Sequence, residues 1–192
     1  MQLFPETDPK QKVLVLNPGP VVVADQPAVS WQLIIPRPTA AAYLNTSMIV
    51  VNDGSPAVEY VGGAIWSDDV LDMTQDLLAD AFLSSGKIRG VGKSVNTLKA
   101  DYILLVDINE FGLQVGALPD QPKVVVEFTV QLVEAETRSS IAVKTFRQQE
   151  DAAAPQVDVV AEAFNRALKA LFPRLLEWTF SLGKKDLPNP KM

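Results

Sequence analysis

Apolar residues recur at three- and four-residue intervals between residues 70 and 82, a spacing that gathers side chains on one face of a helix. This face consists of Val70, Leu71, Thr74, Leu77, Leu78, Ala81 and Phe82. The opposite face carries Asp69, Asp72, Asp76 and Asp80. We expect these carboxylates to point into solvent and not to converge on a site. Ser67 is the expected N-cap, and Gly86 is expected to end the helix in a left-handed conformation.

A second helical stripe runs from about residue 155 to residue 182. Its apolar positions are Val160, Phe164, Ala167, Leu168, Leu171, Leu175, Trp178 and Leu182. Charged residues such as Asp158 and Glu162 fall on the opposite side, as in an amphipathic helix. Because Pro173 removes one backbone hydrogen bond, we expect a kink near Ala170 or a short break. Gly183 is expected to close the helix.

Shorter apolar runs predict strands on both sides of the first helix. Residues 30–36 and 46–53 are expected to be strands, followed by a mobile loop that contains Tyr60 and the pair Gly62 and Gly63. Residues 87–94 are a weak strand candidate, and residues 100–111 are a strong one. Residues 123–148 alternate and then reverse through a charged turn, which predicts a hairpin with one polar face. Its apolar face carries Val124, Val126, Phe128, Val130 and Leu132.

These elements together predict an α+β fold. A sheet that is apolar on one side and two one-sided helices are typical of a two-layer sandwich, in which both amphipathic helices pack on one face of a mixed or antiparallel sheet. Residues 1–30 hold five of the fourteen prolines and are expected to be an extended lead-in. Residues 31–183 are expected to form a single domain, and residues 184–192 a disordered tail.

The composition removes most catalytic chemistry. The chain has no histidine and no cysteine, so it lacks the commonest general base, the commonest transition-metal ligand and every thiol nucleophile. A net charge of −6 argues against binding to a nucleic-acid backbone. No apolar run approaches the ~20 residues that span a bilayer, and the polar N-terminus does not read as a signal peptide. The protein is therefore expected either in the cytosol or separated from an export signal.

Two short motifs resemble ligand sites but lack required residues. The run ending in Gly92-Lys93-Ser94 resembles a phosphate-binding loop, yet Lys87 stands where the leading glycine belongs. The run from Asp107 to Gly112 begins like a calcium loop, but Phe111 and Leu118 occupy positions that need oxygen ligands. We therefore expect no cofactor, no metal ion and no catalytic residue.

The order of segments resembles the ABC-type transport auxiliary lipoprotein family, which includes the PqiC-like proteins. The resemblance covers residues 31–178. It rests on "WQLIIPRP", "YLNTSMIVV", the aromatic segment that reaches Trp66, "LLADAFLSSGKIRGV", "ADYILLVDINEF", "VEAETRSSIAVKTF" and a last helix with Trp178. The chain departs from the family pattern at Asn45, Met48 and Pro173, and the lipid-attachment cysteine is missing.

This resemblance implies a non-catalytic periplasmic adaptor, held at the outer membrane by an N-terminal lipid. The adaptor would serve an ABC-type system that moves lipids or other hydrophobic compounds. Its implied partner is a membrane-anchored substrate-binding subunit of the mammalian-cell-entry type, and a homo-oligomer is left open. No nucleic acid is implied, and the N-terminal lipid would be the only membrane attachment.

Two alternatives come from the residues themselves. A carrier would hold a small apolar ligand in a pocket between the helices and the sheet. A carboxylate-based hydrolase would use Asp68 or Asp69 beside Trp66. Trp31 and Trp178 are expected in the core.

Tyr43, Tyr60 and Trp66 are the candidates for contact with a partner or ligand, because they lie in or beside loops. Trp66 is also expected to pack on Val70 or Leu71 and so fix the chain's entry into the helix. In this arrangement the outer edge of its ring would stay exposed beside Tyr60.

Overall fold

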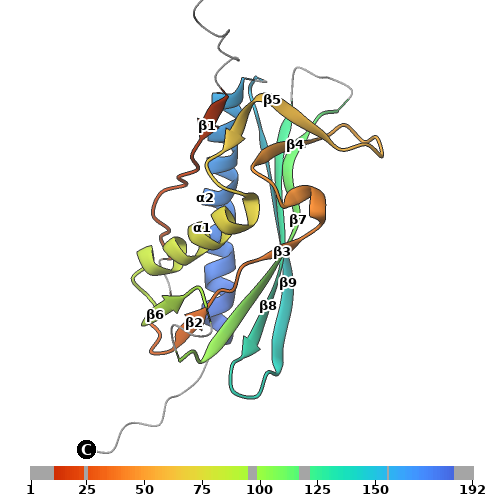
Figure 1. Ribbon diagram of the computed structural model, residues 1–192. Helices are drawn as coiled ribbons and strands as arrows, with labels where there is room; N and C mark the ends of the chain where they lie inside the picture. The colour runs from red at the N-terminus through yellow and green to blue at the C-terminus, as the bar shows by residue number, and fades with distance from the viewer. Residues whose placement is uncertain (1–10, 24–25, 95–98, 117–121, 155, 184–192) are drawn as a thin grey trace, which may run out of the picture.

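The computed structural model describes residues 11–23, 26–94, 99–116, 122–154 and 156–183. Within these ranges the chain forms one mixed sheet with two helices on one of its faces (Figure 1), which confirms the predicted α+β fold. The strands are β1 (Lys12–Leu14), β2 (Gln32–Ile34), β3 (Thr39–Ala40), β4 (Met48–Asn52), β5 (Glu59–Trp66), β6 (Gly90–Gly92), β7 (Tyr102–Gln114), β8 (Lys123–Glu134) and β9 (Ser140–Asp151). The helices are the 3-10 turn η1 (Ala42–Leu44), α1 (Val70–Ser84) and α2 (Val157–Leu182).

Strand β7 organises the sheet. One of its edges pairs antiparallel with β8 along its whole length. Along its other edge β2, β3 and β4 follow one another, each parallel to β7. Parallel pairing needs a long connection, and α1 with its flanking segments provides one between β4 and β7. Next to β2, the sheet continues with β6. Next to β4, it continues with β5, and β1 pairs with β5.

The predicted hairpin is formed by β8 and β9. All five apolar residues on the predicted inward face of β8, from Val124 to Leu132, are fully buried in the core. On the other face of β8, Glu127, Thr129 and Gln131 are half-buried. The alternation therefore predicted correctly which side of this sheet packs against the helices.

Aromatic rings fill the space between the layers. The ring of Trp66 lies edge-on to Phe164 with centroids 4.9 Å apart, and Phe111 stacks on Phe164 at the same separation. Trp31 is 1% exposed, as predicted, and its indole N–H donates to the carbonyl of Gly183 at 2.5 Å. A Cβ at Gly183 would lie 2.5 Å from the Trp31 ring, so this position needs glycine.

The ends of the helices differ in part from expectation. The N-cap of α1 is Asp69, whose carboxylate accepts the N–H groups of Leu71 and Asp72. Ser67 is exposed, and its N–H donates to the carbonyl of Leu14, because the chain is still extended beside β1. Gly86 has φ of 64°, as predicted, and Gly183 is the C-cap of α2.

The structure contradicts a break in α2 at Pro173 and a loop around Gly62 and Gly63. Helix α2 continues through Pro173 without a break, because the residues around it are packed in the core on one side. The segment with Gly62 and Gly63 is not a loop but part of β5. The pairing of β4 with β5 shifts register opposite these glycines, and Gly63 has φ of 77°. The glycine pair therefore marks a bulge inside a strand.

The described part of the lead-in packs against the rest of the chain. β1 pairs with β5, and the side chains of Leu14, Leu16, Val21 and Val23 are buried. The N–H of Asn17 donates to Asn165 of α2 at 2.8 Å. Residues 1–10 and the predicted tail 184–192 lie outside the described residues. Of the helices that the structure describes, none is long and apolar enough to cross a membrane.

Candidate functional site

Arg37 engages two aspartates of the row at the start of α1, and Lys93 pairs with a third, Asp76. Arg37, from the β2–β3 connection, contacts Asp72 at 2.6 Å and Asp69 at 2.8 Å. Asp76 and Asp80 are exposed, as predicted. The expectation that the whole row points into solvent is therefore wrong for Asp69 and Asp72.

The clamp formed by Arg37 also contacts Asn45 at 3.1 Å, so one guanidinium ties η1 and the β2–β3 connection to the start of α1. The hydrogen bond from Arg37 holds the pKa of Asp72 below its ordinary value. Sequence spacing could not reveal this clamp, because Arg37 lies 32 positions before Asp69 in the chain.

Two of the three carboxylates at the start of α1, those of Asp69 and Asp72, are already engaged by other groups. Carboxylate oxygens of Asp68, Asp69 and Asp72 lie within 4.8 Å of one another. Asp69, however, already accepts two helix amides and Arg37, and Asp72 also accepts Arg37. These carboxylates cap and anchor the helix, which leaves Asp69 without a free oxygen to act as nucleophile or proton donor.

Trp66 lies in the core. It is 1% exposed, so the expectation of an exposed outer edge beside Tyr60 is wrong. The cause is the direction of β5, whose last side chain points into the helix layer toward Phe111 and Phe164. Among the described residues, the indole nitrogen of Trp66 has no hydrogen-bond partner.

Tyr43 and Tyr60 remain at the surface, where they are 41% and 36% exposed. The hydroxyl of Tyr60 donates to the carbonyl of Tyr43 at 3.3 Å, which brings η1 beside β5. Met48 of β4 and Val58 just before β5 are also exposed. We refer to Tyr43 and Tyr60 as the aromatic patch.

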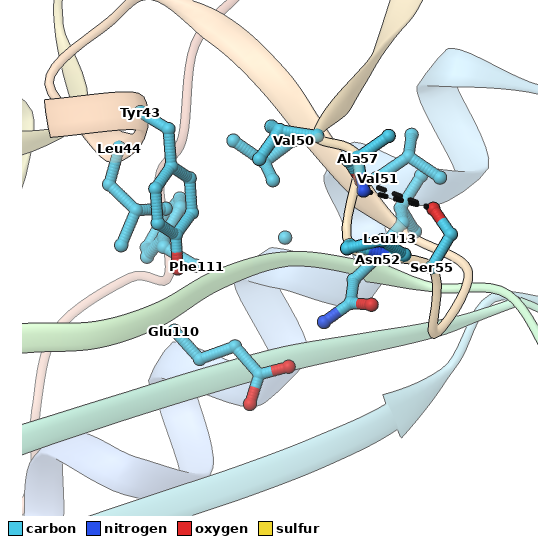
Figure 2. A pocket seen from close by; sticks show the side chains of 13 residues that line it. Tyr43, Leu44, Val50, Val51, Asn52, Ser55, Ala57, Glu110, Phe111 and Leu113 are labelled. Atoms are coloured by element: carbon cyan, nitrogen blue, oxygen red, sulfur yellow. Dashed lines mark hydrogen bonds between the residues drawn. The ribbon is translucent and has the colours of Figure 1, made fainter. Parts of the chain in front are cut away.

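A cavity of about 210 Å³ lies at the aromatic patch, where η1, the β4–β5 turn and β7 meet. Figure 2 shows Tyr43 and Leu44 on one side of it and Asn52, Ser55 and Ala57 on the other. Gly112 of β7 lines the cavity too, and a Cβ there would lie 2.8 Å from the carbonyl of Val50. Only glycine therefore allows β4 to approach β7 in this way. The sequence signal for this site is the apolar run from Pro56 to Val58 within the β4–β5 turn. Neither the helical period nor the strand alternation points to this run.

One acidic residue lines this cavity, and further carboxylates lie close to its lining residues in the chain or by contact. Glu110, which lines it, and Glu127 both accept hydrogen bonds from Arg147, at 2.7 and 2.6 Å, so two carboxylates share one guanidinium. The contact with Arg147 lowers the pKa of Glu127. Asp53 lies in the β4–β5 turn, and the hydrogen bonds from Ser55 lower its pKa. This region therefore stays negatively charged well below neutral pH.

The space between helices and sheet is filled. In that layer the side chains of Phe128, Phe164, Leu168 and Leu171 are fully buried, and they belong to one continuous core. The cavities found among the described residues lie at the surface instead, partly open to solvent.

Comparisons with known proteins support both the α+β fold and the resemblance to the transport auxiliary family. A crystal structure of a Xanthomonas campestris protein has a TM-score of 0.84 and 26% identity, and the match covers 91% of this chain and 98% of that one. A hypothetical protein from Chlamydia trachomatis shares the fold at a TM-score of 0.54 and 9% identity, over 80% of this chain and 98% of that one. No curated protein matches the chain. A family model for the ABC-type transport auxiliary lipoprotein component matches residues 14–174, and the chain belongs to this family.

Proposed function

We propose that this protein is a non-catalytic adaptor of an ABC-type transport system for lipids or other hydrophobic compounds. It works in the periplasm, anchored at the outer membrane by an N-terminal lipid. Its partner is a membrane-anchored substrate-binding subunit of the mammalian-cell-entry type. Family membership supports the link to ABC-type transport and to the cell envelope, and the choice of substrate and partner rests on the resemblance.

The observation that carries an adaptor role is the aromatic patch beside the cavity. Tyrosine is enriched at protein interfaces because one end of its side chain is apolar and the other forms hydrogen bonds. Tyr43 and Tyr60 are partly exposed, and the Tyr60 hydroxyl is held by the backbone carbonyl of Tyr43, so ordering the Tyr60 ring on binding costs little entropy. Tyr60 also lies on β5, which pairs with β4 in the sheet and gives the patch a rigid base.

The test is capture of the partner. The lipidated protein is co-expressed with the membrane subunit of its own transport system, purified from detergent extract, and the bound subunit is quantified. We expect Tyr43→Ala combined with Tyr60→Ala to reduce capture at least about tenfold, which corresponds to 1.4 kcal/mol. Leu83→Ala is the matched control. It also truncates an exposed apolar side chain, 51% exposed, but on the different element α1. Equal capture by both variants contradicts the proposed interface, and no capture by the unaltered protein contradicts the proposed partner.

A further inference from the structure

We propose that the cavity beside Tyr43 receives one apolar side chain from an extended segment of a protein partner, and that basic residues flank this side chain. The inference rests on the proposed adaptor function and specifies the chemistry that the adaptor recognises. Three properties of the cavity carry it, namely its size, its unused hydrogen-bonding groups and its charge.

The size suits a single side chain. An engineered protein cavity of about 150 Å³ holds one benzene molecule. The cavity at the aromatic patch has a volume of about 210 Å³ and is partly open to solvent. Its apolar lining includes Leu44, Val50, Pro56 and Phe111. A leucine or phenylalanine side chain fits these dimensions, whereas a long acyl chain would extend far outside them.

Polar groups at the cavity suit a peptide backbone. The side-chain oxygen of Asn52 accepts the N–H of Gly54 at 2.9 Å, which leaves the amide NH₂ of Asn52 to donate elsewhere. Within the described ranges, neither this NH₂ nor the hydroxyl of Tyr43 has a partner. Figure 2 shows Tyr43 and Asn52 on opposite sides of the cavity. A peptide that crosses the cavity can hydrogen-bond to both while its side chain points inward.

The charge of the surroundings selects a basic segment. Glu110 lines the cavity, and Asp53 and Glu59 directly follow the lining residues Asn52 and Val58 in the chain. Arg147 is shared between Glu110 and Glu127, so it offsets only part of this negative charge. Lysine or arginine next to the inserted side chain would gain from these carboxylates, and glutamate would be repelled.

Three acetylated, amidated tripeptides test the inference by NMR titration of the ¹⁵N-labelled protein. Lys-Leu-Lys has both features, Lys-Ser-Lys lacks the apolar side chain, and Glu-Leu-Glu reverses the charge. We expect Lys-Leu-Lys to shift the amide signals of Val50, Asn52 and Gly112 and to bind at least about tenfold more tightly than Lys-Ser-Lys. It should also bind about threefold or more tightly than Glu-Leu-Glu, with the difference shrinking at 1 M salt.

Matched variants locate the binding. Ala57→Phe fills the mouth of the cavity from an exposed turn and should abolish the shifts caused by Lys-Leu-Lys. Ala170→Phe, on an exposed position of α2, should leave them unchanged. Asp53→Asn combined with Glu59→Gln should weaken binding of Lys-Leu-Lys. Glu162→Gln combined with Glu177→Gln removes the same charge from α2 and should not weaken it.

Several results would overturn the inference. These are no binding of any tripeptide, equal binding of all three, or stronger shifts of the same amides by 1-hexanol, which would indicate a pocket for small apolar molecules. Partner capture that depends on Tyr43 and Tyr60 without any tripeptide binding would keep the adaptor role and reject this cavity as its specificity site. Tripeptide binding without partner capture would reject the proposed partner alone.

Discussion

Trp66→Ala is expected to destabilise the protein more than any other single truncation at the sites discussed. Trp66 is 1% exposed and lies against Phe111 and Phe164, and its backbone N–H donates to the carbonyl of Ser47 at the end of β5. Truncation of a buried tryptophan to alanine costs about 3–5 kcal/mol. With a urea dependence of about 1–3 kcal/mol per molar, the unfolding midpoint should fall by roughly 1–5 M.

Urea unfolding followed by circular dichroism measures this change. Tyr60→Ala is the comparison, because Tyr60 is 36% exposed and should cost less than about 1 kcal/mol. Trp66→Phe should cost much less than Trp66→Ala, since phenylalanine keeps ring contacts and removes the unpaired indole N–H. If the midpoint of Trp66→Ala equals that of the unaltered protein, the assignment of this ring to the core is refuted.

Three other predictions follow from particular contacts. Gly183→Ala should lower the free energy of unfolding by about 1–3 kcal/mol because its Cβ would meet the Trp31 ring, whereas Gly62→Ala, with open space around it, should change it little in the same melts. Arg147 lowers the pKa of Glu127, so their ion pair contributes its full stabilisation at pH values above the ordinary Glu pKa of 4.5. This contribution is lost as the pH falls through the lower pKa that Glu127 has in the folded protein. In Arg147→Met, the free energy of unfolding should therefore decrease less between about pH 5 and pH 3 than in the unaltered protein. Calcium should leave the thermal midpoint unchanged, because Arg37 already occupies oxygens of both Asp69 and Asp72. A shift of several degrees would show that the acidic group binds the ion.

Part of the candidate site could be predicted from the sequence. Tyr43 and Tyr60 were identified because aromatic residues beside turns often stay at the surface, and both are partly exposed. Trp66 has the same local signal but is buried, because only the pairing of β5 with β1 and β4 determines the direction of its side chain. The cavity depends on Gly112 and Val50, which are far apart in the chain, so no local pattern could indicate it.

The sequence by itself determined the elements whose signals are local. The three- and four-residue period of α1 and α2, the two-residue alternation of β8 and the glycines that end both helices act over a few neighbouring residues. Together they also determined the α+β class, since one-sided helices and a one-sided sheet must bury their apolar faces against each other.

Only the tertiary structure decided what depends on pairing between distant segments. Gly62 and Gly63 became a strand bulge because β4 and β1 lie on either side of β5, and Asp69 replaced Ser67 as the helix cap because β1 keeps Ser67 extended. Arg37 selects two of the four aspartates on α1 because the β2–β3 connection passes beside them. Such contacts follow from three-dimensional packing, which local periodicity does not encode.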